Sequence, residues 1–286
     1  MQAARLARSL SPLVASTCRR RVWDSPMRFH LRRYATPQGA APATATNRAE
    51  ATLKRFWKTV DVEKRGDSLA VTLDKRPLKT PSGNQLLIPQ EKKLVATLIA
   101  TEWENQETLL KPHALPMTSL TARAIDNMRD EASRAEVRAA LLKYLDTDTV
   151  CFYSDEPPPL VRLQQEHWDP LLDWVRKTFD VEIQTSESVI FFSQPEETKK
   201  KLDEVLSKFD PWQMAAMERA TYTTKSFLIA LALVHKHLTA EQAAAAAQVE
   251  VASQIERWGE VEDSHDVDYH DVRRHLGSSA CLLANV

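Results

Sequence analysis

The residues with the clearest capacity for chemistry lie at positions 263–271, where four aspartates and two histidines occur within nine residues. Imidazole and carboxylate groups bind divalent metal ions, so the segment raises the hypothesis of a metal-dependent hydrolase. On a helix, Asp266 and His270 share a face, whereas His265 and His270 are five residues apart and do not. A two-histidine zinc face requires a spacing of four. The pattern therefore favours a solvated, pH-sensitive polar surface over a metal site.

Other residue types that serve in catalysis are scattered. His235 and His237 lie two apart near the end of a predicted helix, so they are expected to face different directions and to interact with the helix dipole. His113 lies in a proline-bounded loop without a neighbouring nucleophile, and Cys151 stands between apolar residues as a small buried hydrophobe. These separate groups give little support for a pair of nucleophile and base, and we expect no cofactor and no bound metal.

Glu250, in a helix predicted over 240–258, is a candidate for contact with a partner protein. Glu250, Gln254 and Arg257 recur at i, i+4 and i+7 and share one face of this helix. The neighbouring inward stripe is predicted to consist of Val251, Ile255 and Trp258. A carboxylate on the flank of the core is a position that a partner protein can reach.

Composition excludes several classes of function. The 286 residues include only five glycines, none close enough to another to form a phosphate-binding loop. The three cysteines are widely separated and form no CxxC pair, which indicates a reducing compartment. No apolar run approaches the length of a membrane-spanning helix, so membrane insertion is not expected.

The charge is divided unevenly along the chain. Residues 1–34 contain eight arginines, no lysine and one acid, Asp24, and this arginine-rich, acid-poor pattern is typical of a mitochondrial presequence. We expect the mature chain to begin near Ala35 and residues 35–51 to form a flexible lead-in. The part after residue 34 has a net charge of −8, which disfavours binding to nucleic acid.

Two kinds of periodicity follow the lead-in. Alternating apolar and polar residues predict a small antiparallel meander with strands at 56–62, 69–73, 78–80 and 86–88. Helical spacing predicts a covering helix at 90–106 and a second helix ending at 128. Further helices are predicted at 131–146, 160–179, 195–208, 211–237, 240–258 and 266–276, and the apolar stretch 228–234 should place the fourth of these at the centre of a bundle. The predicted class is α+β, with an α/β domain at 52–128 and an all-helical domain at 129–286.

Several short motifs, in this order, resemble a known family, the assembly chaperones for the α subunit of the ATP synthase catalytic head. The resemblance runs from about residue 54 to residue 275, and the stretch 75–81 is its most specific part. The motifs are Phe56-Trp57-Lys58, Lys75-Arg76-Pro77-Leu78-Lys79-Thr80-Pro81, Leu87-Ile88-Pro89, Glu102-Trp103, Pro116-Met117-Thr118, Ala124-Ile125-Asp126, Asp148-Thr149-Val150-Cys151 and Arg257-Trp258-Gly259.

The resemblance implies a mitochondrial matrix protein that is a chaperone and not an enzyme. Its partner would be the unassembled α subunit, held soluble until the β subunit replaces it. The resemblance implies that the family needs Trp103 of the Glu-Trp motif and Glu250. Gln254, Arg257 and Trp258, on the same helix as Glu250, are further candidates for partner binding. Arg123 departs from the small or amide residue that is usual at its position in this family.

Overall fold

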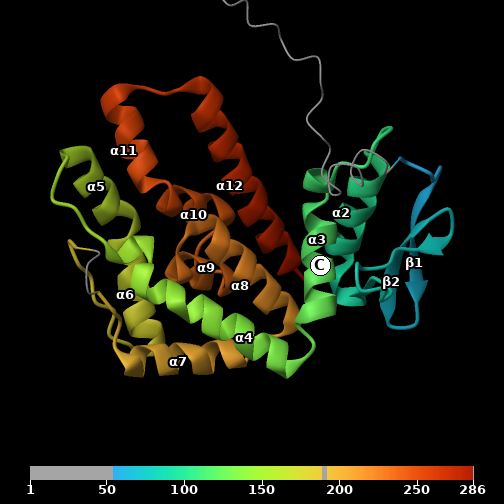
Figure 1. Ribbon diagram of the computed structural model, residues 1–286, viewed down its shortest axis with the longest axis horizontal. Helices are drawn as coiled ribbons and strands as arrows, with labels where there is room; N and C mark the ends of the chain where they lie inside the picture. Colours follow the sequence, from blue (N-terminus) through green and yellow to red (C-terminus); the bar gives the residue numbers. More distant parts are fainter. Residues whose placement is uncertain (1–53, 189–191, 286) are drawn as a thin grey trace, which may run out of the picture. The chain divides into compact units, whose positions relative to one another are not determined.

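The computed structural model describes residues 54–188 and 192–285, and it confirms the α+β class with a small antiparallel sheet and a larger set of helices (Figure 1). The expected presequence and lead-in lie outside the described residues. The proposed domain boundary at residue 128 stays a prediction. The strands are β1 (Val60–Arg65), β2 (Ser68–Leu73), β3 (Arg76–Pro77) and β4 (Leu87–Pro89).

The sheet is antiparallel as predicted, but it is not a simple meander. Strand β2 pairs with β1 along one edge and with both β3 and β4 along the other. The first strand also begins later than position 56. The carboxylate of Asp74 accepts the backbone N–H groups of Lys58 and Thr59, so these groups are not available to a sheet.

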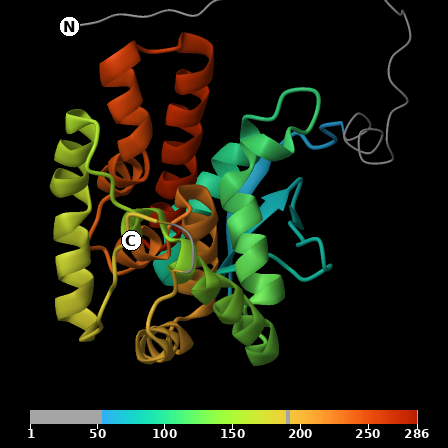
Figure 2. The same cartoon turned by 60° about the vertical axis from the view of Figure 1, so that its left-hand side comes forward.

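The helices occupy most of the remaining chain, and α2 lies over the sheet as predicted (Figures 1 and 2). Helix α3 packs against α2 on one side and against α8 and α12 on the other. No helix among the described residues is long and apolar enough to cross a membrane. The helices are α2 (Lys93–Glu104), α3 (Pro116–Asn127), α4 (Glu131–Leu142), α5 (Pro158–His167), α6 (Asp169–Phe179), α7 (Glu196–Ser207), α8 (Pro211–Thr224), α9 (Phe227–Val234), α10 (Ala240–Ala247), α11 (Val249–Trp258) and α12 (Glu262–Leu282).

Three helices that were predicted to be continuous are each divided in two, so these predictions were wrong: 160–179, 211–237 and 240–258. The first break follows from Pro170, which occupies the first turn of a new helix after Trp168. At the second break, Lys225 adopts a left-handed conformation with φ of 56°, and the Ser226 hydroxyl caps the next helix by accepting the N–H of Ile229. The apolar periodicity of the sequence continues across these breaks. Only the residues at the helix ends, such as Pro170 and Ser226, indicate where one helix stops and the next begins.

Helix α9 lies at the centre of the bundle, as its apolar sequence predicted, and all eight of its residues are buried. An entirely apolar helix has no polar side chain of its own to satisfy its first N–H groups. The carboxylate of Asp148, from a distant part of the chain, accepts the N–H of Leu228 at 2.9 Å and that of Val150 at 3.1 Å. Burial raises the pKa of Asp148 to about 6, against the lowering effect of its hydrogen bonds from Ser226 and the backbone.

Helix α12 is longer than the predicted 266–276, and its carboxyl end is anchored to the first part of the chain. Lys92 is buried, and its ammonium donates to the carbonyl of Leu282 at 2.9 Å and to Oδ1 of Asn285 at 3.1 Å. The ammonium also lies 5.6 Å from the ring centre of Trp212 on α8. One lysine therefore joins the start of α2, the end of α12 and α8.

Asp148→Asn tests the raised pKa of the buried carboxyl. Because the native state binds this proton more tightly than the unfolded state, Asp148 contributes stability at low pH that is lost as the pH rises through about 6. The difference in unfolding free energy, wild type minus variant, should fall by about 2 kcal/mol between about pH 4.5 and pH 7. Urea unfolding of both proteins across this range measures it, and a difference independent of pH would contradict the assignment.

Candidate protein-binding surface

The Glu-Trp motif is a joint between α2 and α3. The carboxylate of Glu102 accepts the N–H groups of Met117 and Thr118, at 2.6 and 2.9 Å, and thus caps the amino end of α3. Trp103 is half-buried; its Nε1 donates to the Thr118 hydroxyl at 3.1 Å, and its ring packs on Trp57 with centres 5.0 Å apart. The structure therefore gives Trp103 a role in packing and leaves little of it for a partner.

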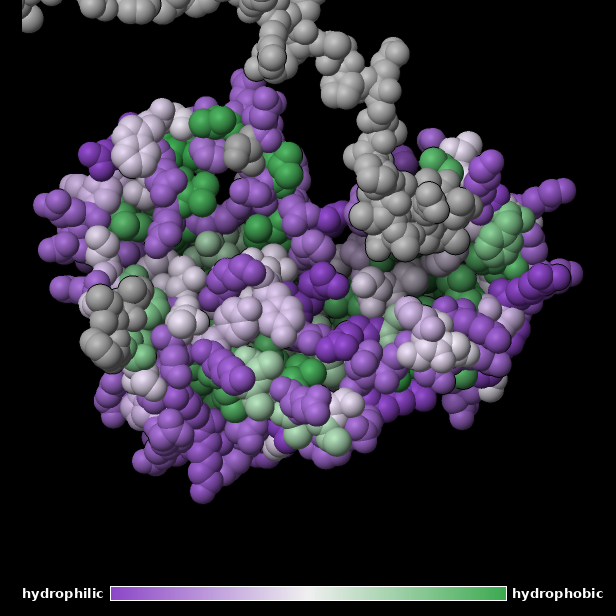
Figure 3. All heavy atoms as spheres, in the orientation of Figure 1, coloured by the Kyte–Doolittle hydropathy of each residue, from purple (hydrophilic) through white to green (hydrophobic). Residues whose placement is uncertain are grey.

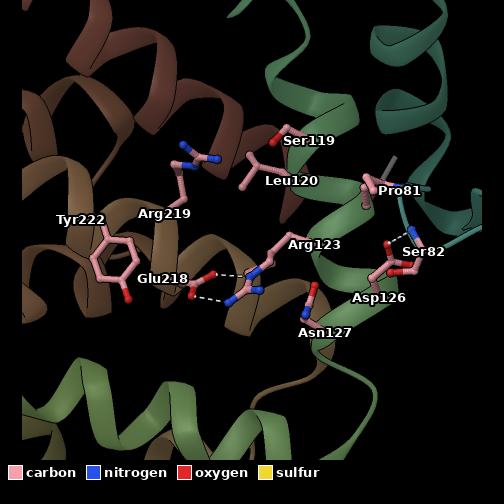
Figure 4. Close-up of a pocket in the computed structure, with 12 residues that line it drawn as sticks. Pro81, Ser82, Ser119, Leu120, Arg123, Asp126, Asn127, Glu218, Arg219 and Tyr222 are labelled. Carbon is pink, nitrogen blue, oxygen red and sulfur yellow. Dashed lines mark hydrogen bonds and ion pairs between the residues drawn. The ribbon is translucent and has the colours of Figure 1, made fainter. Parts of the chain in front are cut away.

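Two other motifs of the sequence meet beside an open pocket of about 510 Å³ between α3 and α8, which polar and apolar side chains line together (Figure 4). Asp126 accepts the Thr80 hydroxyl at 2.6 Å, which joins the Lys-Thr-Pro motif to the Ala-Ile-Asp motif. Arg123 donates twice to Glu218, at 2.7 and 2.8 Å. The unusual arginine thus forms a bidentate ion pair that links α3 to α8.

The acidic and histidine-rich segment 263–271 does not gather into a metal site. Among the residues that the structure describes, no three His, Cys, Asp or Glu side chains come together as metal ligands. His265 accepts the N–H of Val261 at the start of α12, and Asp271 pairs with His275 one turn later at 3.4 Å. Over this part of the chain, the hydrolase hypothesis therefore lacks the site that it requires.

The other candidate groups have structural roles. The expectation that His235 and His237 face different directions was wrong: the backbone turns at Lys236, where φ is 59°, and both rings contact Trp174. The imidazole of His237 stacks on Trp174 at 4.3 Å, and burial lowers the pKa of His235. Cys151 is buried as predicted, and burial raises the pKa of its thiol, which disfavours a nucleophilic role.

Helix α11 displays the Glu250 face to solvent. Glu250, Gln254 and Arg257 are all exposed. The prediction that Trp258 faces inward was wrong, because 69% of its surface is exposed and the Arg257 guanidinium lies 5.0 Å from its ring centre. Trp258 is the last residue of α11, and the chain changes direction at Gly259, where φ is 85°. The side chain of Trp258 therefore does not pack into the core.

Four large apolar side chains around the connection between α11 and α12 are exposed, and we call this set the apolar tip. Its members are Trp258, Val261, Val267 and Tyr269, which are 69, 59, 65 and 45% exposed. They come from the end of α11, the connecting loop and the first turns of α12, and apolar side chains are visible at this end of the molecule in Figure 3. Val267 and Tyr269 are two residues apart on α12 and face different sides of it, so the tip offers apolar side chains for protein contact on more than one side.

A groove of about 390 Å³ lies beside the apolar tip, between α5, α11 and α12. Its apolar wall includes Leu163, Val249, Val251, Ala252, Ile255 and Tyr269. Val251 and Ile255, which were predicted to face the core, are only half-buried because they line this open groove. Sequence reasoning missed the groove, since its walls come from separate helices.

Comparison with known proteins gives the family. The model of the ATP12 chaperone protein family matches residues 54–176. The mitochondrial protein atp12 of Schizosaccharomyces pombe is 35% identical over 237 residues, which cover 80% of this chain and 81% of that protein. The chain belongs to the ATP12 chaperone family. The mitochondrial ATP12 of Saccharomyces cerevisiae is 33% identical, with 83% of this chain and 86% of that protein covered.

The fold agrees with solved members of the ATP12 family. The crystal structure of Atp12 from Paracoccus denitrificans matches with a TM-score of 0.69 and 29% identity, covering 82% of this chain and 98% of that one. A variant of the same protein with lysine in place of an aspartate matches equally well. Both relatives are named as mitochondrial proteins, in agreement with the expected mitochondrial location.

Trp103→Arg should destabilise the fold, because it removes the contact with Trp57 and the hydrogen bond to Thr118. Loss of a largely packed tryptophan costs about 2–3 kcal/mol, or about 5–10 °C in Tm. Trp258→Arg is the matched control, since the same change at an exposed tryptophan should leave Tm nearly unchanged. Equal melting temperatures for Trp103→Arg and wild type would contradict the packing role.

Proposed function

We propose that this chain is a molecular chaperone for assembly of the catalytic head of mitochondrial ATP synthase. It acts in the mitochondrial matrix, binds the unassembled α subunit and prevents its aggregation until the β subunit replaces it. It is not an enzyme. Membership of the ATP12 chaperone family supports the general role, and the sequence motifs support the choice of partner.

The observation that carries the proposal is the apolar tip next to the exposed face of α11. An orphan subunit exposes the apolar surface that it will bury in the complex, and such surfaces aggregate. Trp258 supplies a large, exposed aromatic ring of the kind that anchors protein interfaces. A chaperone with such a surface covers the subunit until assembly.

Charged groups on the exposed face of α11 set the orientation of the partner. Glu250 and Arg257 are exposed on α11, and neither has an ion-pair partner of opposite charge among the described residues. Charges at an interface rim contribute to specificity and association rate more than to affinity. An arrangement of this kind permits selective binding that remains weak enough for the α subunit to be transferred.

The test is co-expression of residues 35–286, which include all the described residues, with the ATP synthase α subunit alone. We expect the α subunit to stay soluble and to co-purify with the chaperone. The α subunit expressed without the chaperone is the reference. Precipitation of the α subunit beside a folded, soluble chaperone would refute the proposed function.

Glu250→Lys should weaken capture of the α subunit about tenfold and leave the fold intact, because the carboxylate is exposed and makes no ion pair in the described structure. Glu136→Lys, at an exposed glutamate of α4, reverses the same charge elsewhere and is the control. Circular dichroism verifies the fold, and co-purification measures capture. Equal capture by both variants would show that the position of Glu250 has no importance.

A further inference from the structure

The groove between α5, α11 and α12 has a lining that a client segment of defined chemistry would fit. Its apolar wall is open to solvent, and its volume of about 390 Å³ lies in the range of pockets that hold small apolar groups. The guanidinium of Arg273, which also lines the groove, lies 3.4 Å from the ring centre of Tyr269. The groove is thus open to apolar side chains in this structure.

The charges around the groove are not balanced. Glu256 pairs with Arg162 at 2.6 Å, and Arg273 pairs with Glu241 at 2.7 Å, so these four charges neutralise one another. Glu260 lines the groove without an ion pair in the described part of the chain. His167 and His265 also line the groove. Four further acids follow Glu260 on the exposed start of α12, outside the groove lining, and have no ion pair among the described residues: Glu262, Asp263, Asp266 and Asp268.

We propose that the groove binds an apolar segment of the α subunit that carries lysine or arginine beside its apolar side chains. This inference rests on the proposed function and adds a chemical description of the segment that is recognised. Apolar side chains of the segment pack against Val251, Ala252 and Ile255. Its lysine or arginine side chains lie near Glu260 and the acidic start of α12. Charge complementarity of this kind selects one class of segment among the many apolar ones.

The groove is separate from the Glu250 face. Neither Glu250, Gln254 nor Arg257 lines it. At 100° per residue, the mean direction of Val251, Ala252 and Ile255 is about 140° around the helix axis from that of the Glu250 face. Helix α11 therefore presents two surfaces, and substitutions in one can be made without altering the other.

The experiment uses fluorescent 20-residue peptides that tile the α subunit, titrated with the full chain and followed by fluorescence anisotropy. We expect binding only by peptides that combine an apolar side with basic residues, and weaker binding as salt is raised. Ala252→Trp, which fills the groove, should lower affinity about tenfold or more. Ala135→Trp makes the same change at an exposed alanine of α4 and should leave affinity unchanged.

Two further variants keep the test decisive if Ala252→Trp folds poorly. Ile255→Ser removes part of the half-buried apolar wall, and Glu260→Gln removes the unpaired charge. Both should weaken peptide binding about threefold to tenfold, and Glu260→Gln should also reduce the salt dependence. Unchanged affinity in folded forms of both variants would overturn the inference.

The outcomes separate this inference from the proposed function. If the chain keeps the intact α subunit soluble but no basic, apolar peptide binds, the inference fails and the function stands. If the α subunit is not kept soluble, the function itself fails. A peptide of residues 1–34, which has eight arginines and one acid, is included as a rival occupant. Tighter binding of this peptide than of every α-subunit peptide, lost in Ala252→Trp, would also overturn the inference.

Discussion

The fold depends on the buried carboxylate of Asp148 at the amino end of α9. An entirely apolar helix can lie at the centre of a bundle only if other segments satisfy the N–H groups of its first turn. Asp148 accepts one of these groups, and the Ser226 hydroxyl accepts another. These hydrogen bonds offset the free-energy cost of burying the carboxylate, and the surrounding helices pack on the apolar surface of α9.

The motifs that carry the family resemblance form joints of the same kind. Glu102 caps α3, Asp126 receives the hydroxyl of Thr80, and Asp148 caps α9. Each is a carboxylate that ties together elements distant in sequence. These three motifs therefore specify how the chain folds, whereas the Arg257-Trp258-Gly259 motif contributes an exposed aromatic ring at the end of α11.

The sequence predicted those features that depend on local patterns. The apolar run at 228–234 identified the central helix, and alternation identified the antiparallel sheet. The prediction from sequence failed where the backbone of a single residue interrupts a helix whose apolar periodicity continues, as at Lys225 with its left-handed conformation. It also placed Trp258 inside, because helical spacing does not tell where the neighbouring helices end. The groove was beyond prediction, since it needs three helices brought together by the tertiary fold.

The anchoring of α12 by Lys92 connects the apolar tip to the first part of the chain through one helix. Helix α12 has 21 residues and is thus about 30 Å long. Its carboxyl end is fixed beside α2 by a lysine 190 positions earlier in the sequence, and its amino end bears Val267 and Tyr269 of the apolar tip. Between its two ends the helix packs against α8 and α10, and Arg273 pairs with Glu241 at the start of α10. The position of Val267 and Tyr269 is therefore coupled through one helix both to the bundle and to the start of α2.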